Sequence, residues 1–104
     1  MKTMFSMLLI GVIALPYLAD ASGISDYKAY CAGCHGANGN VPTEKAKALK
    51  MDVKKLSLIL SVKSSEQMIT IIESGKGSMP DFKKQLSRER IVAIVDYVQA
   101  LKKR

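Results

Sequence analysis

The chain has 104 residues, of which 48% are apolar, and its 16 Lys and Arg against 9 Asp and Glu give a net charge of +7. This length accommodates one domain and excludes a two-domain enzyme, a large sandwich or a barrel. Two Cys and one His are too few for a structural zinc site, which needs about four such ligands.

Residues 1–21 have the pattern of a cleaved secretory signal peptide. Lys2 precedes a mainly apolar run from Met4 to Leu15, and Ala19-Asp20-Ala21 supplies the small residues before a cleavage site. The run makes about 18 Å of helix, too short for a hydrocarbon core of about 30 Å. We therefore expect cleavage, with an uncleaved membrane tether as the alternative. The mature domain is then 22–104, exported to the periplasm or an equivalent compartment such as a lumen, without stable membrane insertion.

Helical patterns dominate the rest of the chain, and strand patterns are nearly absent, so the predicted class is all-α. So small a helical domain usually needs a staple such as a metal, a disulfide or a cofactor. The predicted segments in the first half are a helix over 24–31 capped by Ser22 or Ser25, a turn-rich stretch over 33–42, a short helix over 45–51 and an apolar stretch of undecided structure over 56–62. Those in the second half are a helix from Ser64 or Ser65 to just before Gly75, a loop over 75–86, and a last helix capped by Ser87 with Lys102, Lys103 and Arg104 in its final turn.

The sequence Cys31-Ala32-Gly33-Cys34-His35 follows the C-x-x-C-H pattern of covalent haem attachment. The spacing suits this chemistry because two intervening residues place both thiols along one edge of the macrocycle, and the turn then brings the imidazole beneath the iron. Cys31 and Cys34 are therefore the predicted attachment residues, and His35 is the predicted axial ligand.

Two other interpretations of the cysteine pair stay open at this point. A disulfide between Cys31 and Cys34 would close a very small loop and leave His35 without a role. A thiol-disulfide oxidoreductase normally places such a pair at the start of a helix after a strand, whereas this pair ends a predicted helix. Haem attachment fits an exported helical chain better than either.

A second axial ligand is expected from a methionine, because His35 is the only histidine. Of the methionines outside the leader, Met51 follows a charged stretch and Met68 shares an apolar helix face with core residues. Met79 lies in a polar loop and is followed by a stiffening proline, so an apolar side chain there needs a reason. An axial thioether supplies that reason, and His/Met ligation raises the reduction potential of a haem.

Over essentially all of 22–103 the chain resembles the small class I c-type cytochromes of bacteria and algal lumens, and three segments carry this resemblance. The resemblance implies an all-α cytochrome c fold of three to five helices wrapped around one covalently bound haem, with the N- and C-terminal helices crossing. It also implies one haem c with its iron, held by Cys31, Cys34, His35 and Met79, and one haem edge exposed for electron exchange. The segments are Gly23-x-x-x-Tyr27-x-x-x-Cys31, Gly75-Lys76-Gly77-Ser78-Met79-Pro80-Asp81-Phe82 and Ile94-Val95-Asp96-Tyr97-Val98-x-x-Leu101.

The resemblance further implies residues around the haem. Members of the family use a proline carbonyl to accept the Nδ1 proton of the axial histidine, and Pro42 is the candidate here. The apolar side chains expected to form the pocket wall, where haem contact and ordinary core packing coincide, are Leu49, Leu56, Ile59, Met68, Phe82 and Val95.

With both axial positions filled, the iron does not readily bind oxygen, peroxide or substrate. The predicted function is therefore transfer of single electrons between redox partners, and the predicted protein is a monomeric carrier and not an enzyme. A haem enzyme or a gas or redox sensor with an open sixth position is the main alternative, and the thiol-disulfide oxidoreductase is a weaker one.

The basic residues predict the kind of partner. Lys76, Lys83 and Lys84 flank Met79 and are expected to steer docking to acidic redox proteins. Nucleic acid is not an expected partner of an exported haem protein. A second basic group fits docking and an ordinary solvated helix face equally well; it consists of Lys45, Lys47, Lys50, Lys54 and Lys55.

Overall fold

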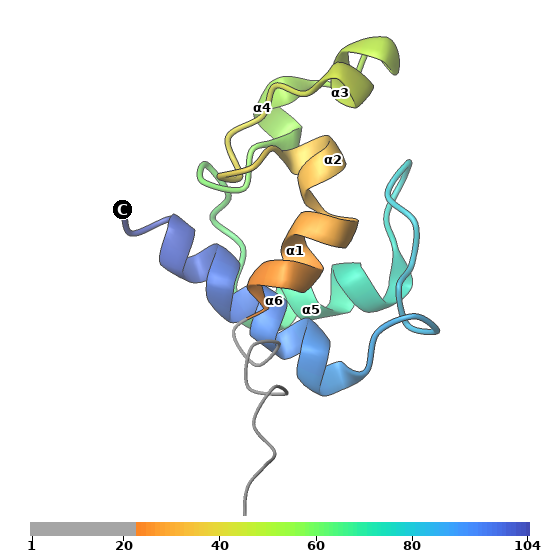
Figure 1. Ribbon diagram of the computed structural model, residues 1–104, viewed down its shortest axis with the longest axis vertical. Helices are drawn as coiled ribbons and strands as arrows, with labels where there is room; N and C mark the ends of the chain where they lie inside the picture. The colour runs from red at the N-terminus through yellow and green to blue at the C-terminus, as the bar shows by residue number, and fades with distance from the viewer. Residues whose placement is uncertain (1–22) are drawn as a thin grey trace, which may run out of the picture.

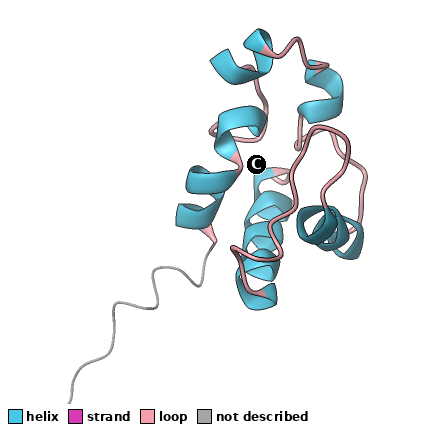
Figure 2. Ribbon diagram, turned by 90° about the vertical axis from the view of Figure 1, so that its right-hand side faces the viewer, coloured by secondary structure: helices cyan, strands magenta, loops and turns pink. Residues whose placement is uncertain are grey.

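The computed structural model describes residues 23–104, and the predicted leader and cleavage site lie outside the described residues. The described part is helical and contains no strand, so the predicted all-α class is confirmed (Figures 1 and 2). No helix within it is long and apolar enough to cross a membrane. Six helical segments are present where three to five were expected, because two of them are single turns. They are α1 (Ile24–Tyr30), α2 (Ala32–His35), α3 (Glu44–Ala48), α4 (Val53–Leu56), α5 (Ser65–Ser74) and α6 (Arg88–Leu101).

The two longest helices begin where the sequence predicts. The Ser64 hydroxyl accepts the Gln67 N–H at 3.2 Å, and the Gln67 side chain accepts the Ser64 N–H at 2.8 Å. This reciprocal pair satisfies two of the donors that a helix start leaves free. Ser87 accepts the Arg90 N–H at 3.2 Å in the same way. α5 ends directly before Gly75, as expected.

Three predicted details of the helix ends are wrong. α1 begins at Ile24 as predicted, but its N-cap is Gly23, without a side-chain cap, and not Ser25; Ser22 lies outside the described residues. The helix predicted over 45–51 instead covers Glu44–Ala48, because Thr43 caps it by accepting the Ala46 N–H at 3.0 Å. At the other end of the chain Lys102 is the C-cap of α6, so the three basic residues follow the final turn.

The first and last helices cross, as the resemblance implies, and the crossing is very close (Figure 1). Gly23 has φ 75, and a Cβ atom built on it would lie 2.3 Å from the carbonyl oxygen of Ala93. Only glycine combines this backbone conformation with this approach. One step along the crossing, the rings of Tyr27 and Tyr97 meet edge to face with centroids 5.3 Å apart. The largest fully buried side chains are Tyr27 on α1 and Ile91, Ile94 and Val95 on α6.

An ion pair joins α1 to α6. Arg90 donates from Nε and Nη2 to the two carboxylate oxygens of Asp26, at 2.9 and 2.7 Å. The Asp26 side chain is 8% exposed and that of Arg90 45% exposed. The hydrogen bond from Arg90 holds the pKa of the Asp26 carboxyl below its ordinary value of 3.8, against the opposing effect of burial. The ionised pair therefore contributes stability that is present above about pH 4.

Replacing Asp26 with Asn is expected to lower the free energy of unfolding by about 1–2 kcal/mol at pH 7, since two charge-assisted hydrogen bonds are weakened and half-exposed Arg90 stays solvated. Because the folded-state pKa of Asp26 is depressed, wild type should lose its advantage as the pH falls below about 4. Denaturant unfolding of both proteins from pH 7 to pH 3 measures this. If the free energies of unfolding of wild type and variant differed equally at pH 7 and pH 3, the ionised Asp26–Arg90 pair would not be the source of the difference.

Candidate haem site

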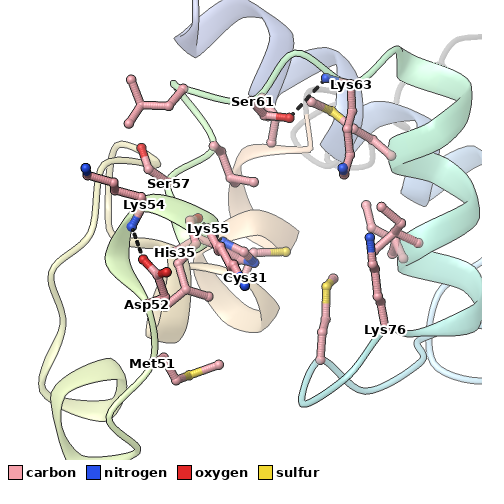
Figure 3. Close-up of a pocket in the computed structure, with 18 of the residues that line it drawn as sticks. Cys31, His35, Met51, Asp52, Lys54, Lys55, Ser57, Ser61, Lys63 and Lys76 are labelled. Carbon is pink, nitrogen blue, oxygen red and sulfur yellow. Dashed lines mark hydrogen bonds between the residues drawn. The ribbon is translucent and has the colours of Figure 1, made fainter.

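A cavity of about 700 Å³ lies between α2, the segment 49–63, α5 and the loop after α5. Figure 3 shows Cys31 and His35 on one side of it and Lys63 and Lys76 on the other. The structure brings three of the four predicted haem-binding residues to this cavity: Cys31, His35 and Met79 line it together.

The two cysteines are one helical turn apart. Cys31 ends α1 and precedes α2, and its carbonyl accepts the N–H groups of Cys34 and His35 at 3.2 and 3.0 Å. Neither thiol is in a disulfide. Cys31 is buried and faces the cavity, whereas Cys34 is half-buried and lies outside the lining. The hydroxyl of buried Tyr27 donates to the Gly36 carbonyl at 2.6 Å, which ties the end of this motif to the helix crossing.

The surroundings of Cys31 do not favour a reactive thiolate. Burial, with a smaller contribution from the negative charge of Asp26, raises the pKa of the Cys31 thiol to about 12. Redox and nucleophilic cysteines work as thiolates and have lowered pKa values. The burial of the Cys31 thiol therefore argues against the thiol-disulfide oxidoreductase.

The imidazole of His35 is oriented by a main-chain carbonyl. Its Nδ1 lies 2.7 Å from the carbonyl oxygen of Leu56. A carbonyl only accepts, so Nδ1 carries a proton, and in the neutral ring the lone pair is then on Nε2. The prediction that Pro42 supplies this carbonyl is wrong. Leu56 is the last residue of α4, where carbonyls have no partner within the helix, whereas Pro42 lies next to the start of α3.

Met79 is held in a tight turn. The N–H of Lys76 donates to the carbonyl of Met79 at 3.0 Å, and the N–H of Met79 donates back at 2.9 Å. Gly77 has φ 57, which suits glycine at this turn. Just before the turn, a Cβ atom on Gly75 would lie 2.8 Å from the carbonyl oxygen of Met79. The backbone thus places Met79 at the cavity and leaves it little freedom.

Two further thioethers lie at the same cavity. Met51 and Met68 both line it, and both were considered less suitable as ligands. Met68 is buried in the core between α5 and α6, and the side-chain amide of Gln99 lies 3.6 Å from its sulfur. This placement agrees with the predicted packing role of Met68.

The predicted pocket wall is partly correct. Leu49, Leu56, Met68 and Val95 line the cavity, whereas Ile59 and Phe82 do not. Phe82 packs against the core instead. The wall also contains residues that were not predicted, and the apolar stretch over 56–62 was the signal for three of them, Leu58, Leu60 and Val62. The additional apolar residues are Leu58, Leu60, Val62, Ile71, Ile72, Ile94 and Val98.

Lysines surround the cavity, but they are only partly those predicted. Lys76 lines it, whereas Lys83 and Lys84 do not. The other cavity lysines come from the segment before α5, and Asp52 is the single acidic residue among the lining residues. Asp52 caps α4 by accepting the Lys54 N–H at 3.0 Å (Figure 3). The cavity lysines are Lys50, Lys54, Lys55, Lys63 and Lys76.

The residues at the cavity fit a haem. The volume of the cavity, about 700 Å³, is in the range of cofactor sites, about 300–1,000 Å³. The lining of the cavity includes the imidazole of His35, which can bind iron through nitrogen, and the thioethers of three methionines. The rest of the wall is largely apolar. Leu60 and Val62 line it although they are 65% and 97% exposed. Apolar side chains grouped in this way are typical of a surface that a bound apolar group covers.

Comparison with known proteins places the chain among haem proteins. The family described as "Cytochrome C oxidase, cbb3-type, subunit III" matches residues 19–98. A cytochrome c6 of Nostoc sp. is 31% identical over 106 positions, covering 94% of this chain and 92% of the relative. A cytochrome c6 of Microcystis aeruginosa is 40% identical over 79 positions, covering 75% of this chain and 91% of the relative. A cytochrome c6 of Leptolyngbya boryana is 37% identical, covering 75% and 87%.

Proposed function

The chain belongs to the small monohaem class I c-type cytochromes, and from this premise we propose that it carries single electrons through a haem bonded to Cys31 and Cys34, with His35 and Met79 as axial ligands. The observation that supports this most is the meeting of His35 and Met79 at one cavity. They come from elements far apart in the sequence, α2 and the turn at 76–79. Cys31 lies in the same wall.

A bound haem supplies the one-electron couple of its iron. The chain's residues prepare the site for it. The hydrogen bond from Nδ1 of His35 to Leu56 directs the Nε2 lone pair and strengthens it as a donor. A thioether from Met79 favours the ferrous state and so a higher reduction potential. The apolar wall keeps water away, which favours the less charged state in the same direction.

A redox titration of the purified holoprotein, followed by its absorption spectrum, tests this function. We expect one reversible one-electron transition between two low-spin states, and no reaction with peroxide, because both axial positions are filled. An open-site enzyme or sensor would instead give a high-spin spectrum and would bind small ligands without delay. Such a result would contradict the electron-carrier function.

The place of action follows from the leader. If residues 1–21 are removed as a signal peptide, the domain 22–104 acts in the periplasm or an equivalent compartment. N-terminal sequencing of the protein from an exporting host tests this, with cleavage before Ser22 as the expected result. A mature protein that still begins at residue 1 would support the membrane tether instead.

Docking is best assigned to the cavity lysines defined above. Their positive charge surrounds the cavity proposed to hold the haem, and it suits an acidic redox protein. Lys83 and Lys84 flank Met79 in sequence but lie outside the cavity lining, so we give them a smaller role than the sequence predicts. One copy of the chain carries all the lysines needed for this contact, and we propose that the protein is monomeric.

The double variant Lys54→Glu, Lys55→Glu should slow electron exchange with an anionic oxidant such as hexacyanoferrate by about tenfold or more at low ionic strength. The difference should shrink as salt is added, because salt screens exposed charges. Exchange with a cationic couple such as hexaammineruthenium should become faster. Stopped-flow kinetics measures both rates.

Lys83→Glu, Lys84→Glu is the matched control, since it changes net charge equally away from the cavity. We expect it to have the smaller effect. If it slowed the anionic couple more than the variant of Lys54 and Lys55, docking would belong to the flanking lysines, as first predicted from the sequence.

A further inference from the structure

An aromatic pair joins the first helix to the loop that carries Met79. The rings of Tyr30 and Phe82 meet edge to face, with centroids 5.7 Å apart and planes at 70°. Tyr30 is the last residue of α1 and directly precedes Cys31, and Phe82 follows Met79 by three residues. The pair therefore connects the two segments on which the proposed haem bonds depend.

Phe82 is the point at which this loop is attached to the fold. Its N–H donates to the carbonyl of Ile72 on α5 at 2.9 Å, and its own carbonyl accepts the Leu86 N–H at 2.9 Å. Its side chain packs against the hydrophobic core. Tyr30 is the α1 residue that the Phe82 ring contacts. It lies on the outside of the fold, with 40% of its surface exposed. A movement of the loop that withdraws Met79 from the cavity would separate the two rings.

We propose that Tyr30 is a positioning residue for Met79: its ring holds Phe82, and through it the loop from Gly75 to Phe82, against α1. This inference rests on the proposed role of Met79 as an axial ligand. Edge-to-face pairs stabilise the arrangement that contains them beyond the area they bury. The Tyr30–Phe82 pair accordingly lowers the population of the state in which Met79 is away from the iron.

The test is the affinity of the ferric holoprotein for imidazole, which binds only when the thioether has left. Tyr30→Ala should bind imidazole about three- to tenfold more tightly than wild type, the factor that one aromatic pair provides. Tyr30→Phe should bind as wild type does, because the ring is kept. Val53→Ala is the control, since Val53 is also half-exposed (45%) and lies outside the cavity lining.

A double-mutant cycle separates the pair from general loosening. Phe82→Leu should also tighten imidazole binding, and adding Tyr30→Ala to it should produce little further change. A merely structural tyrosine would lower the melting temperature and leave the imidazole affinity unchanged. That outcome, or a full Tyr30→Ala effect in the Phe82→Leu background, would overturn the inference. A wild-type ferric protein without the weak red band of thioether-ligated haem would overturn the Met79 assignment itself.

Discussion

Met79→Ala is expected to leave the haem attached and to open its iron to added ligands. In the proposed site the attachment depends on Cys31 and Cys34, which the substitution does not touch, whereas the sixth position would lose its thioether. If the state with Met79 detached is about 1% populated, as minor states commonly are, removing the thioether raises the imidazole affinity about 100-fold. The reduction potential should fall, because the thioether favours the ferrous state.

An absorption titration with imidazole and a redox titration measure these two changes. The controls are Met51→Leu and Met68→Leu, which remove the other two cavity thioethers and keep apolar side chains of similar volume. Both should keep the thioether-ferric band. An unchanged spectrum for Met79→Ala, together with loss of the band in either control, would transfer the ligand role to that methionine.

Gly23→Ala should be the most destabilising single substitution in the helix crossing. The new Cβ would lie 2.3 Å from the Ala93 carbonyl oxygen, in a backbone conformation with φ 75 that alanine rarely adopts. Strained backbone and overpacking each cost about 1–3 kcal/mol, so we expect a loss of about 2–6 kcal/mol. Small domains have about 5–15 kcal/mol of stability in total.

Chemical denaturation of the variant and wild type measures this loss. Gly33→Ala is the matched control, because a Cβ at Gly33 has no atom within 4 Å and its φ is not positive. It should be neutral or slightly stabilising, as alanine is in a helix. A loss below about 1 kcal/mol for Gly23→Ala would contradict the close crossing of α1 and α6.

The features that depend on neighbouring residues could be predicted from the sequence. Ser64 and Ser87 cap helices because the hydroxyl and the N–H that it accepts are three residues apart. Met79 is proposed as the ligand by elimination, since an apolar residue in a polar loop has no local explanation, and the structure places it at the cavity. In the same way, Cys31 and His35 were expected to act together because one helical turn joins them.

Several features that depend on distant residues could not be predicted. The carbonyl that orients His35 comes from Leu56, 21 residues away, and its position depends on where the four-residue helix α4 ends. Gly23 takes the N-cap position because the last helix passes so close to it, which local capping preferences do not describe. The segment 56–62 lacks a period because most of its apolar side chains, those of Leu56, Leu58, Leu60 and Val62, line a cavity.

The attachment of haem to Cys31 and Cys34 is the claim on which the remaining assignments depend. Mass spectrometry of the denatured protein from an exporting host that assembles c-type cytochromes tests it most directly, combined with the absorption spectrum of the same sample. We predict one haem that stays bonded to the polypeptide after denaturation, and a peptide carrying it that contains both cysteines. A colourless protein of unmodified mass with two titratable thiols would contradict this account.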